Sequence, residues 1–257
     1  PMLNFDCRYP IEGAAVQWRG GISRHDAVVW AFARAAGALG VDIVQGCEVT
    51  GFRIEGGRVA GLETTLGEVA TPRVCLAVAG HSSELARKAG IALPIVSQAL
   101  QAMVTEPVKP LLRTVLLSPL VHVYLSQSDR GEIVIGGGSD IHQSYAQRGG
   151  LPAFEANAAA AVELFPCLGR LRVMRQWAGL VDITPDTSPI MGLSPVEGLF
   201  LSAGWGTGGY KAIPAGGETM AWTIANGRPH ELIAAFGLDR FARGALVDEG
   251  AASGVAH

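Results

Sequence analysis

The sequence contains few lysines, and its positive charges do not cluster. Lys88, Lys109 and Lys211 are the only lysines among 257 residues, and 20 Lys and Arg residues stand against 23 Asp and Glu residues, for a net charge of −3. A nucleic-acid interface needs a concentrated positive patch, so we expect no nucleic-acid partner. The chain also lacks an uninterrupted apolar run of about 18 residues, so we expect no membrane-spanning helix.

The four cysteines have no spacing typical of a metal site. No CxxC pair occurs among the cysteines, which are Cys7, Cys47, Cys75 and Cys167. No two histidines have the spacing of metal ligands. We therefore expect no metal site and reduced, partly buried thiols. Together with the absence of a signal-peptide pattern at the first residues, this predicts a cytoplasmic location.

The composition is that of a folded protein, with 49% apolar residues, 17% charged residues and 34 glycines. The first part of the chain favours a helix over 25–39, with Val28, Val29, Phe32 and Leu39 on one apolar face. Short strands follow, separated by glycine turns, and the apolar run at 74–78 is typical of a strand buried on both faces. The strands are predicted at 41–44, 47–54, 58–64, 67–70 and 74–78.

The middle of the chain predicts an antiparallel sheet with one helix, and the last part returns to a strand followed by a helix. The sheet strands are expected at 97–104, 114–117, 121–126 and 132–136, a further strand at 172–183, the helices at 151–165 and 208–226, and a last strand at 199–203. The fold class is therefore α/β with α+β character. We divide the chain into part of a nucleotide-binding unit at 1–94, a sheet-and-helix substrate unit at 95–183, and a segment at 184–257 that returns to the nucleotide-binding unit and ends in the C-terminal tail.

A glycine cluster joins that last strand to the last helix, in the order Gly204, Trp205, Gly206, Thr207, Gly208, Gly209, Tyr210 and Lys211. It matches GxGxxG, but a dinucleotide fingerprint opens a βαβ unit, and no second strand is predicted after residue 209. A surface turn with a solvated lysine is another interpretation. A strand–glycine loop–helix junction also directs N–H groups at an anion, and a lysine beside it adds charge, which suits a carboxylate ligand.

His25 lies at the start of the first helix, after Arg24. By pattern alone, a histidine there is most often a cap or a surface residue. Asp186, with Ser188 and Pro189 beyond it, is typical of an Asx turn.

Several long segments in a fixed order resemble the β subunits of bacterial heterotetrameric sarcosine oxidases, within the D-amino-acid-oxidase-like flavoproteins. The resemblance covers essentially residues 4–257. The segments are RYPIEGA (8–14), RHDAVVWAFARAA (24–36), GVDIVQGCEVTGF (40–52), LAVAGHSS (76–83), SYAQRGG (144–150), WAGLVDITPDTSPIMG (177–192), GWGTGGYKAIPAGG (204–217) and LDRFARGALVDEGAA (238–252).

The resemblance implies an FAD-dependent amine-oxidase-like, two-domain architecture and a complex with α, γ and δ subunits. It implies oxidation of sarcosine to glycine with hydrogen peroxide, the one-carbon unit leaving as formaldehyde or passing to tetrahydrofolate. It further implies non-covalent FAD, FMN bound covalently to His25, and NAD on the α subunit. In some family members a lysine precedes this histidine, where this chain has Arg24.

Carried over by position, the resemblance assigns the substrate carboxylate to Lys211. The FAD ring is assigned to the glycine loop that precedes Lys211. The amides of this loop and the start of the helix after it are expected to stabilise charge on the reduced ring. The adenine is assigned to the backbone of Val49, and the diphosphate and ribose to Ala79 and Gly80. The loop residues expected to line the ring are Gly204, Trp205, Gly206, Thr207, Gly208 and Gly209.

The family's first βαβ unit, with its own GxGxxG motif, has no counterpart in the chain as it begins at Pro1. We therefore expect the chain alone to bind FAD weakly and to lack sarcosine oxidase activity. Two alternatives remain open: a related FAD-dependent dehydrogenase of D-amino acids or secondary amines, and a truncated assembly subunit without catalysis.

Overall fold

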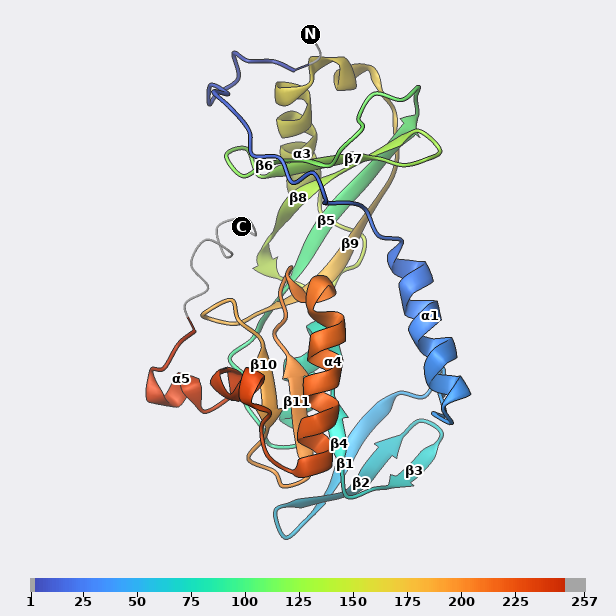
Figure 1. Ribbon diagram of the computed structural model, residues 1–257, viewed down its shortest axis with the longest axis vertical. Coiled ribbons are helices and arrows are strands. Elements are labelled where there is room, and N and C mark those ends of the chain that lie inside the picture. Colours follow the sequence, from blue (N-terminus) through green and yellow to red (C-terminus); the bar gives the residue numbers. More distant parts are fainter. Residues whose placement is uncertain (1–2, 248–257) are drawn as a thin grey trace.

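A computed structural model describes residues 3–247, apart from the side chain of Ile141. Residues 1–2 and 248–257, including the end of the 238–252 segment, lie outside the described residues. The molecule is elongated, with a sheet-and-helix unit at one end and a layered unit at the other (Figure 1). This mixture of helices with parallel and antiparallel strands confirms the predicted α/β class.

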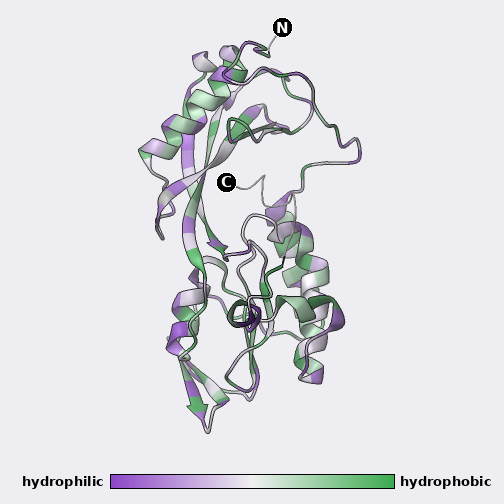
Figure 2. Cartoon of the chain, turned by 90° about the vertical axis from the view of Figure 1, so that its left-hand side faces the viewer, coloured by the Kyte–Doolittle hydropathy of each residue, from purple (hydrophilic) through white to green (hydrophobic). Residues whose placement is uncertain are grey.

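The first unit is a five-stranded antiparallel sheet in the order β6-β7-β8-β5-β9. Along β5, buried residues recur at every second position from Ser97 to Thr105, as expected for a strand with one covered face. Three of these buried residues, Ser97, Gln101 and Thr105, are polar, and Figure 2 shows hydrophilic and hydrophobic residues mixed along the long strands. The strands are β5 (Val96–Pro107), β6 (Leu116–Ser118), β7 (Val123–Gln127), β8 (Glu132–Gln143) and β9 (Val173–Ile183).

Helix α3 (Leu151–Leu164) covers this sheet and is followed by a 3-10 helix, η2 (Pro166–Arg170). Met103, Leu125 and Ile133 of the sheet share one buried core with Ala161 and Leu164. The first segment of the chain also joins this core, through Leu3, Cys7 and Ile11. The predicted division at residues 95 and 183 stays a prediction.

The second unit contains the strand pair that positions the site. β4 (Val74–Leu76) runs parallel to β11 (Leu199–Ala203), and β10 (Ile190–Leu193) pairs with β11 antiparallel. Because parallel strands end at the same edge, the segments after β4 and β11 emerge together. β4 leads into η1 (Ala79–His81) and α2 (Ser82–Lys88), and β11 leads into α4 (Gly209–Asn226). A third sheet holds β1 (Val49–Glu55), β2 (Arg58–Thr64) and β3 (Gly67–Ala70).

Helix α1 (His25–Ala38) forms where predicted, but none of its residues is buried. Of its predicted apolar face, Val29 and Phe32 are exposed and Val28 is half-buried, and Leu39 just beyond the helix is 86% accessible. The strand predicted at 41–44 does not form, since within the described residues it has no neighbouring strand with which to pair. Cys7 is buried and Cys47 and Cys75 are half-buried, whereas Cys167 is exposed, so that part of the prediction is wrong.

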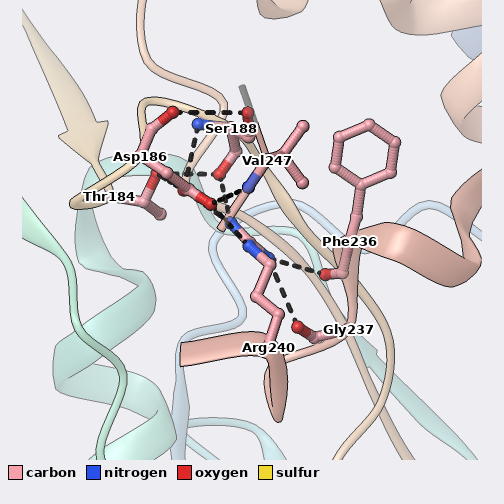
Figure 3. Close-up of polar contacts among 7 residues, drawn as sticks. All are labelled: Thr184, Asp186, Ser188, Phe236, Gly237, Arg240 and Val247. Atoms are coloured by element: carbon pink, nitrogen blue, oxygen red, sulfur yellow. Dashed lines mark hydrogen bonds and ion pairs between the residues drawn. The ribbon is translucent and has the colours of Figure 1, made fainter. Parts of the chain in front are cut away.

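After α4, the described chain forms only η3 (Glu231–Phe236) and α5 (Arg240–Arg243). It therefore supplies no second strand for a βαβ unit up to residue 247. Arg240 is fully buried and pairs with Asp186 in the turn after β9 (Figure 3). No helix within residues 3–247 is both long and apolar enough to cross a membrane.

Candidate active site: a cavity behind the glycine loop

A cavity of about 860 Å³ lies where the end of the five-stranded sheet meets the start of α4. The sheet contributes one side chain or glycine from each of its strands, and η3 closes another side. Most of the lining is apolar. The sheet residues are Leu100, Leu117, Tyr124, Gly137 and Ile183, those of the loop and helix include Trp205, Gly206, Thr207, Gly208 and Lys211, and those of η3 are Leu232, Ile233 and Phe236.

The loop between β11 and α4 requires glycine at two positions. Gly204 has φ +70° and Gly206 has φ +51°, a region that side-chain-bearing residues rarely adopt. A Cβ on Gly204 would also lie 2.5 Å from Cγ2 of Thr184. These glycines therefore let the chain turn sharply from the strand into the helix.

Trp205 holds the helix against the loop. Its indole N–H donates a 3.1 Å hydrogen bond to Oγ of Ser202. A Cβ on Gly209 would lie 2.9 Å from Cβ of Trp205, and one on Gly216 would lie 3.1 Å from the indole ring. Two helix glycines thus make room for the tryptophan, which itself lines the cavity.

Lys211 lies in the first turn of α4 and lines the same cavity. Within residues 3–247 its ammonium takes part in no ion pair, and the residue is exposed. The first N–H groups of a helix have no partner within the helix, and no side chain caps α4 at Gly208. Lys211 and the helix start therefore place two sources of positive potential at one wall of the cavity.

The structure adds one residue that the sequence analysis did not select, Asp182 at the end of β9. Its carboxylate is buried and accepts a 2.5 Å hydrogen bond from the Gly204 N–H, while its carbonyl accepts one of 3.0 Å from the Gly206 N–H. Burial raises the pKa of Asp182 and hydrogen bonds from the loop oppose that shift. The signal available in the sequence was an acidic residue within an apolar stretch. A carboxylate that is buried in such a strand needs hydrogen-bond donors, which nearby loops can supply.

These contacts correct one expectation about the loop. The amides of Gly204 and Gly206 point inward to Asp182 and are not free for a ligand. Gly204 and Gly209 also do not line the cavity, whereas Trp205, Gly206, Thr207 and Gly208 do.

Ala79 and Gly80 lie beside the glycine loop but outside the cavity lining. Ser82 donates from Oγ to the Ala79 carbonyl and, at 3.4 Å, to Asp182. Gly80 packs so closely on β9 that a Cβ would lie 2.5 Å from Cβ of Leu180. Val49 is half-buried at the start of β1 and does not contribute to the cavity either.

His25 is exposed at the first position of α1, and the preceding Arg24 lies 3.6 Å from the Asp26 carboxylate. The hydroxyls of Ser23 and Tyr210 are 2.7 Å apart. This contact joins the start of α1 to the start of α4, next to Lys211. The described residues contain no group of three His, Cys, Asp or Glu side chains able to hold a metal ion.

Comparison with known proteins gives consistent matches. The chain is 51% identical over its whole length to sarcosine oxidase subunit beta of Rhodobacter capsulatus, and 50% identical over its whole length to that of an Arthrobacter species. It spans 62% and 64% of the length of these two curated relatives. Among solved structures, L-proline dehydrogenase from P. horikoshii matches with a TM-score of 0.79 and 28% identity, over 86% of this chain and 60% of that one.

The model of a protein family described as FAD dependent oxidoreductase matches residues 2–222. This range includes the whole loop from Gly204 to Lys211 and most of α4. The chain therefore belongs to the FAD-dependent oxidoreductase family.

Proposed function

We propose that this chain is part of a flavin-dependent sarcosine oxidase subunit. Such an enzyme converts sarcosine to glycine with hydrogen peroxide, and with formaldehyde or 5,10-methylenetetrahydrofolate as the one-carbon product. The observation that carries the proposal is the cavity in which Lys211 lies beside a loop of glycines. The choice of substrate is supported by sequence identities of 51% and 50%, over the whole chain, to two sarcosine oxidase β subunits.

The residues present fit the ring end of FAD. A volume of about 860 Å³ lies within the range of small-molecule sites, roughly 300–1,000 Å³, and suits a flat ring with a small acid beside it. Gly206 and Gly208 leave space on the loop side of the cavity between Trp205 and Thr207, and a Cβ on Gly208 would meet only the Trp205 carbonyl, at 3.9 Å. We propose that Ala79, Gly80 and Val49 serve the remainder of the cofactor.

Lys211 would hold the substrate carboxylate. A charge-assisted hydrogen bond to a small acid contributes about 1.5–3 kcal/mol. Leu100 and Tyr124 of the same lining would supply a surface that suits the N-methyl group. Fixing the acid at one end and the methyl group at the other orients the carbon that is oxidised.

The flavin, when bound, supplies the acceptor for a hydride equivalent. The protein's contribution is position and electrostatics. The free N–H groups at the start of α4 would stabilise negative charge in front of them, and the apolar lining would exclude water, which strengthens that effect.

For His25 we propose covalent attachment of FMN. Its exposure leaves the imidazole open to a ligand or partner chain, and the Ser23–Tyr210 contact keeps it near the first site. A neutral imidazole nitrogen is a competent nucleophile. We further propose assembly with α, γ and δ subunits, the α subunit carrying NAD, with tetrahydrofolate as one-carbon acceptor.

A second candidate is a flavin-dependent dehydrogenase of another secondary amine. It is supported by the match, at 28% identity, to a solved L-proline dehydrogenase. Such an enzyme shares the cavity and Lys211 but does not require a flavin on His25.

One experiment separates the two candidates. The protein is produced with its proposed partner subunits, tested for sarcosine-dependent peroxide formation, then denatured in acid and digested. If the protein is the oxidase, we expect sarcosine-dependent peroxide formation and a yellow, fluorescent peptide that contains His25. His25→Ala should lose that peptide and keep acid-releasable FAD, whereas the control His142→Ala, another exposed histidine, should keep both. FAD without peptide-bound flavin in the unaltered protein would favour the dehydrogenase.

A further inference from the structure

Asp182 lies where the two loops that follow β4 and β11 meet. The residue is only 3% exposed. The carboxylate accepts from Gly204 at 2.5 Å and from Ser82 at 3.4 Å, and the carbonyl of the same residue accepts from Gly206 at 3.0 Å. One residue of β9 thus contacts the start of α2 and both ends of the turn Gly204–Gly206.

No cation accounts for this buried carboxylate. Among the described residues, no Lys, Arg or His forms an ion pair with Asp182, in contrast to Asp186 four positions later. The partners of Asp182 are backbone N–H groups and one hydroxyl. Burying a carboxylate is costly unless its oxygens accept hydrogen bonds, so the native position of the Gly204 N–H offsets part of that cost.

The conformation that Asp182 fixes is the wall of the cavity. Gly206, Thr207 and Gly208 line the cavity directly after the turn, and Lys211 follows in the first turn of α4. Gly204 and Gly206 lack a side chain, so the backbone of this turn has more conformations available than a turn of other residues would have. Both glycines adopt positive φ angles here. The two hydrogen bonds to Asp182 select one of these conformations.

We propose that Asp182 is a positioning residue for the flavin, fixing the Gly204–Gly206 turn so that the start of α4 and Lys211 face the flavin ring. The proposal rests on the proposed function in so far as the cavity holds a flavin. Loss of the acceptor leaves the Gly204 N–H buried without a partner and allows the turn to move.

Two variants separate position from charge. Asp182→Asn keeps an oxygen that can accept from Gly204, and Asp182→Ala has none. Both variants remove the negative charge, so the difference between them reports the turn alone. Asp186→Ala is the matched control, since it removes another buried carboxylate from the same segment, one that among the described residues has no hydrogen bond to the glycine loop.

The first readout is amide hydrogen exchange in the flavin-free protein, taken as the rate at Gly204 relative to Leu201 within β11. We expect the ratio to rise at least tenfold in Asp182→Ala. It should stay within about threefold of the original protein in Asp182→Asn and Asp186→Ala. A merely structural role of Asp182 would raise both rates together and leave the ratio unchanged, which would overturn the proposal.

The second readout is the midpoint potential of the FAD in the flavin-loaded protein with its subunits. The ratio of the affinity for reduced flavin to the affinity for oxidised flavin should be at least tenfold lower in Asp182→Ala than in Asp182→Asn. For a two-electron couple this ratio equals a potential about 30 mV lower. Equal potentials in the two variants, or a fall in Asp186→Ala as large as in Asp182→Ala, would overturn the proposal.

Neither readout uses an amine substrate, so a different substrate preference leaves the test intact. A protein that retains no flavin would refute the proposed function, while the exchange ratio still decides whether Asp182 fixes the turn. If Asp182→Ala does not fold, the original flavin-free protein supplies the decision. Its Gly204 amide must then be as protected as Leu201, and an unprotected Gly204 amide would overturn the proposal.

Discussion

Replacing Arg240 with methionine should destabilise the protein far more than removing an exposed arginine. The Arg240 side chain is fully buried and Asp186 is 2% exposed. Two hydrogen bonds of 2.8 Å join them, and the guanidinium also donates to the carbonyls of Phe236 and Ser188 (Figure 3). Arg240→Met leaves a buried carboxylate without its cation and the Phe236 carbonyl without the guanidinium donor, while the Ser188 carbonyl keeps only the hydrogen bond from Thr184.

Breaking a buried pair from one side costs about 3–5 kcal/mol, a large part of the roughly 5–15 kcal/mol that stabilises a typical protein. Arg8→Met is the control, since Arg8 pairs with Glu163 but is 63% exposed, and because exposed ion pairs are screened by water it should destabilise the protein far less. The double variant Asp186→Asn with Arg240→Met should recover part of the loss because it removes the unpaired charge. Urea unfolding followed by tryptophan fluorescence measures all four proteins. A loss in Arg240→Met no larger than in Arg8→Met would refute the reasoning.

Two further predictions concern pH and the cavity. Burial raises the pKa of Asp186, but hydrogen bonds and the charge of Arg240 outweigh it and lower the pKa to about 2. A lowered pKa stabilises the folded protein above pH 3.8, the ordinary value, by about 2 kcal/mol here, and that stability is lost as the pH falls from about 4 to 2. In acid unfolding, Asp186→Asn should lack this loss. An unchanged dependence of stability on pH in Asp186→Asn would contradict the assignment. Gly208→Val should weaken FAD binding at least tenfold by filling the cavity, with little change in the melting temperature of flavin-free protein. Gly217→Val, at a helix position with nothing within 4 Å, should not weaken binding, and equal affinities in these two variants would show that the flavin lies elsewhere.

Local sequence signals predicted many of the elements. The strands at Arg58–Thr64 and Leu199–Ala203 form residue for residue, since glycine turns bound the first and an apolar run defines the second. The glycine cluster and Lys211 come together at one cavity, as a strand–loop–helix junction requires. The strand Ile190–Leu193 was missed because four residues between a proline turn and a serine carry little periodic signal.

The remaining features depend on contacts between distant segments. The burial of Asp182 follows from the approach of the loops after β4 and β11, which are more than 100 residues apart, and no local pattern records that approach. The apolar face of α1 was correctly recognised as apolar, yet most of it is exposed within the described residues, because periodicity predicts a face and not what covers it. His25 illustrates the same limit, since its local pattern indicated a surface residue and only the family resemblance assigned it a cofactor.

The central claim is that Lys211 holds a carboxylate in front of a flavin. The most direct test titrates the flavin-loaded protein and its Lys211→Met variant with acetate, following the absorbance of the flavin. The account predicts a spectral change in the original protein and at least a tenfold higher Kd in Lys211→Met, since a charge-assisted hydrogen bond contributes about 1.5–3 kcal/mol. Lys88→Met, which alters an exposed lysine outside the cavity, should leave the Kd unchanged. Equal acetate affinity in the original protein and Lys211→Met would contradict the account.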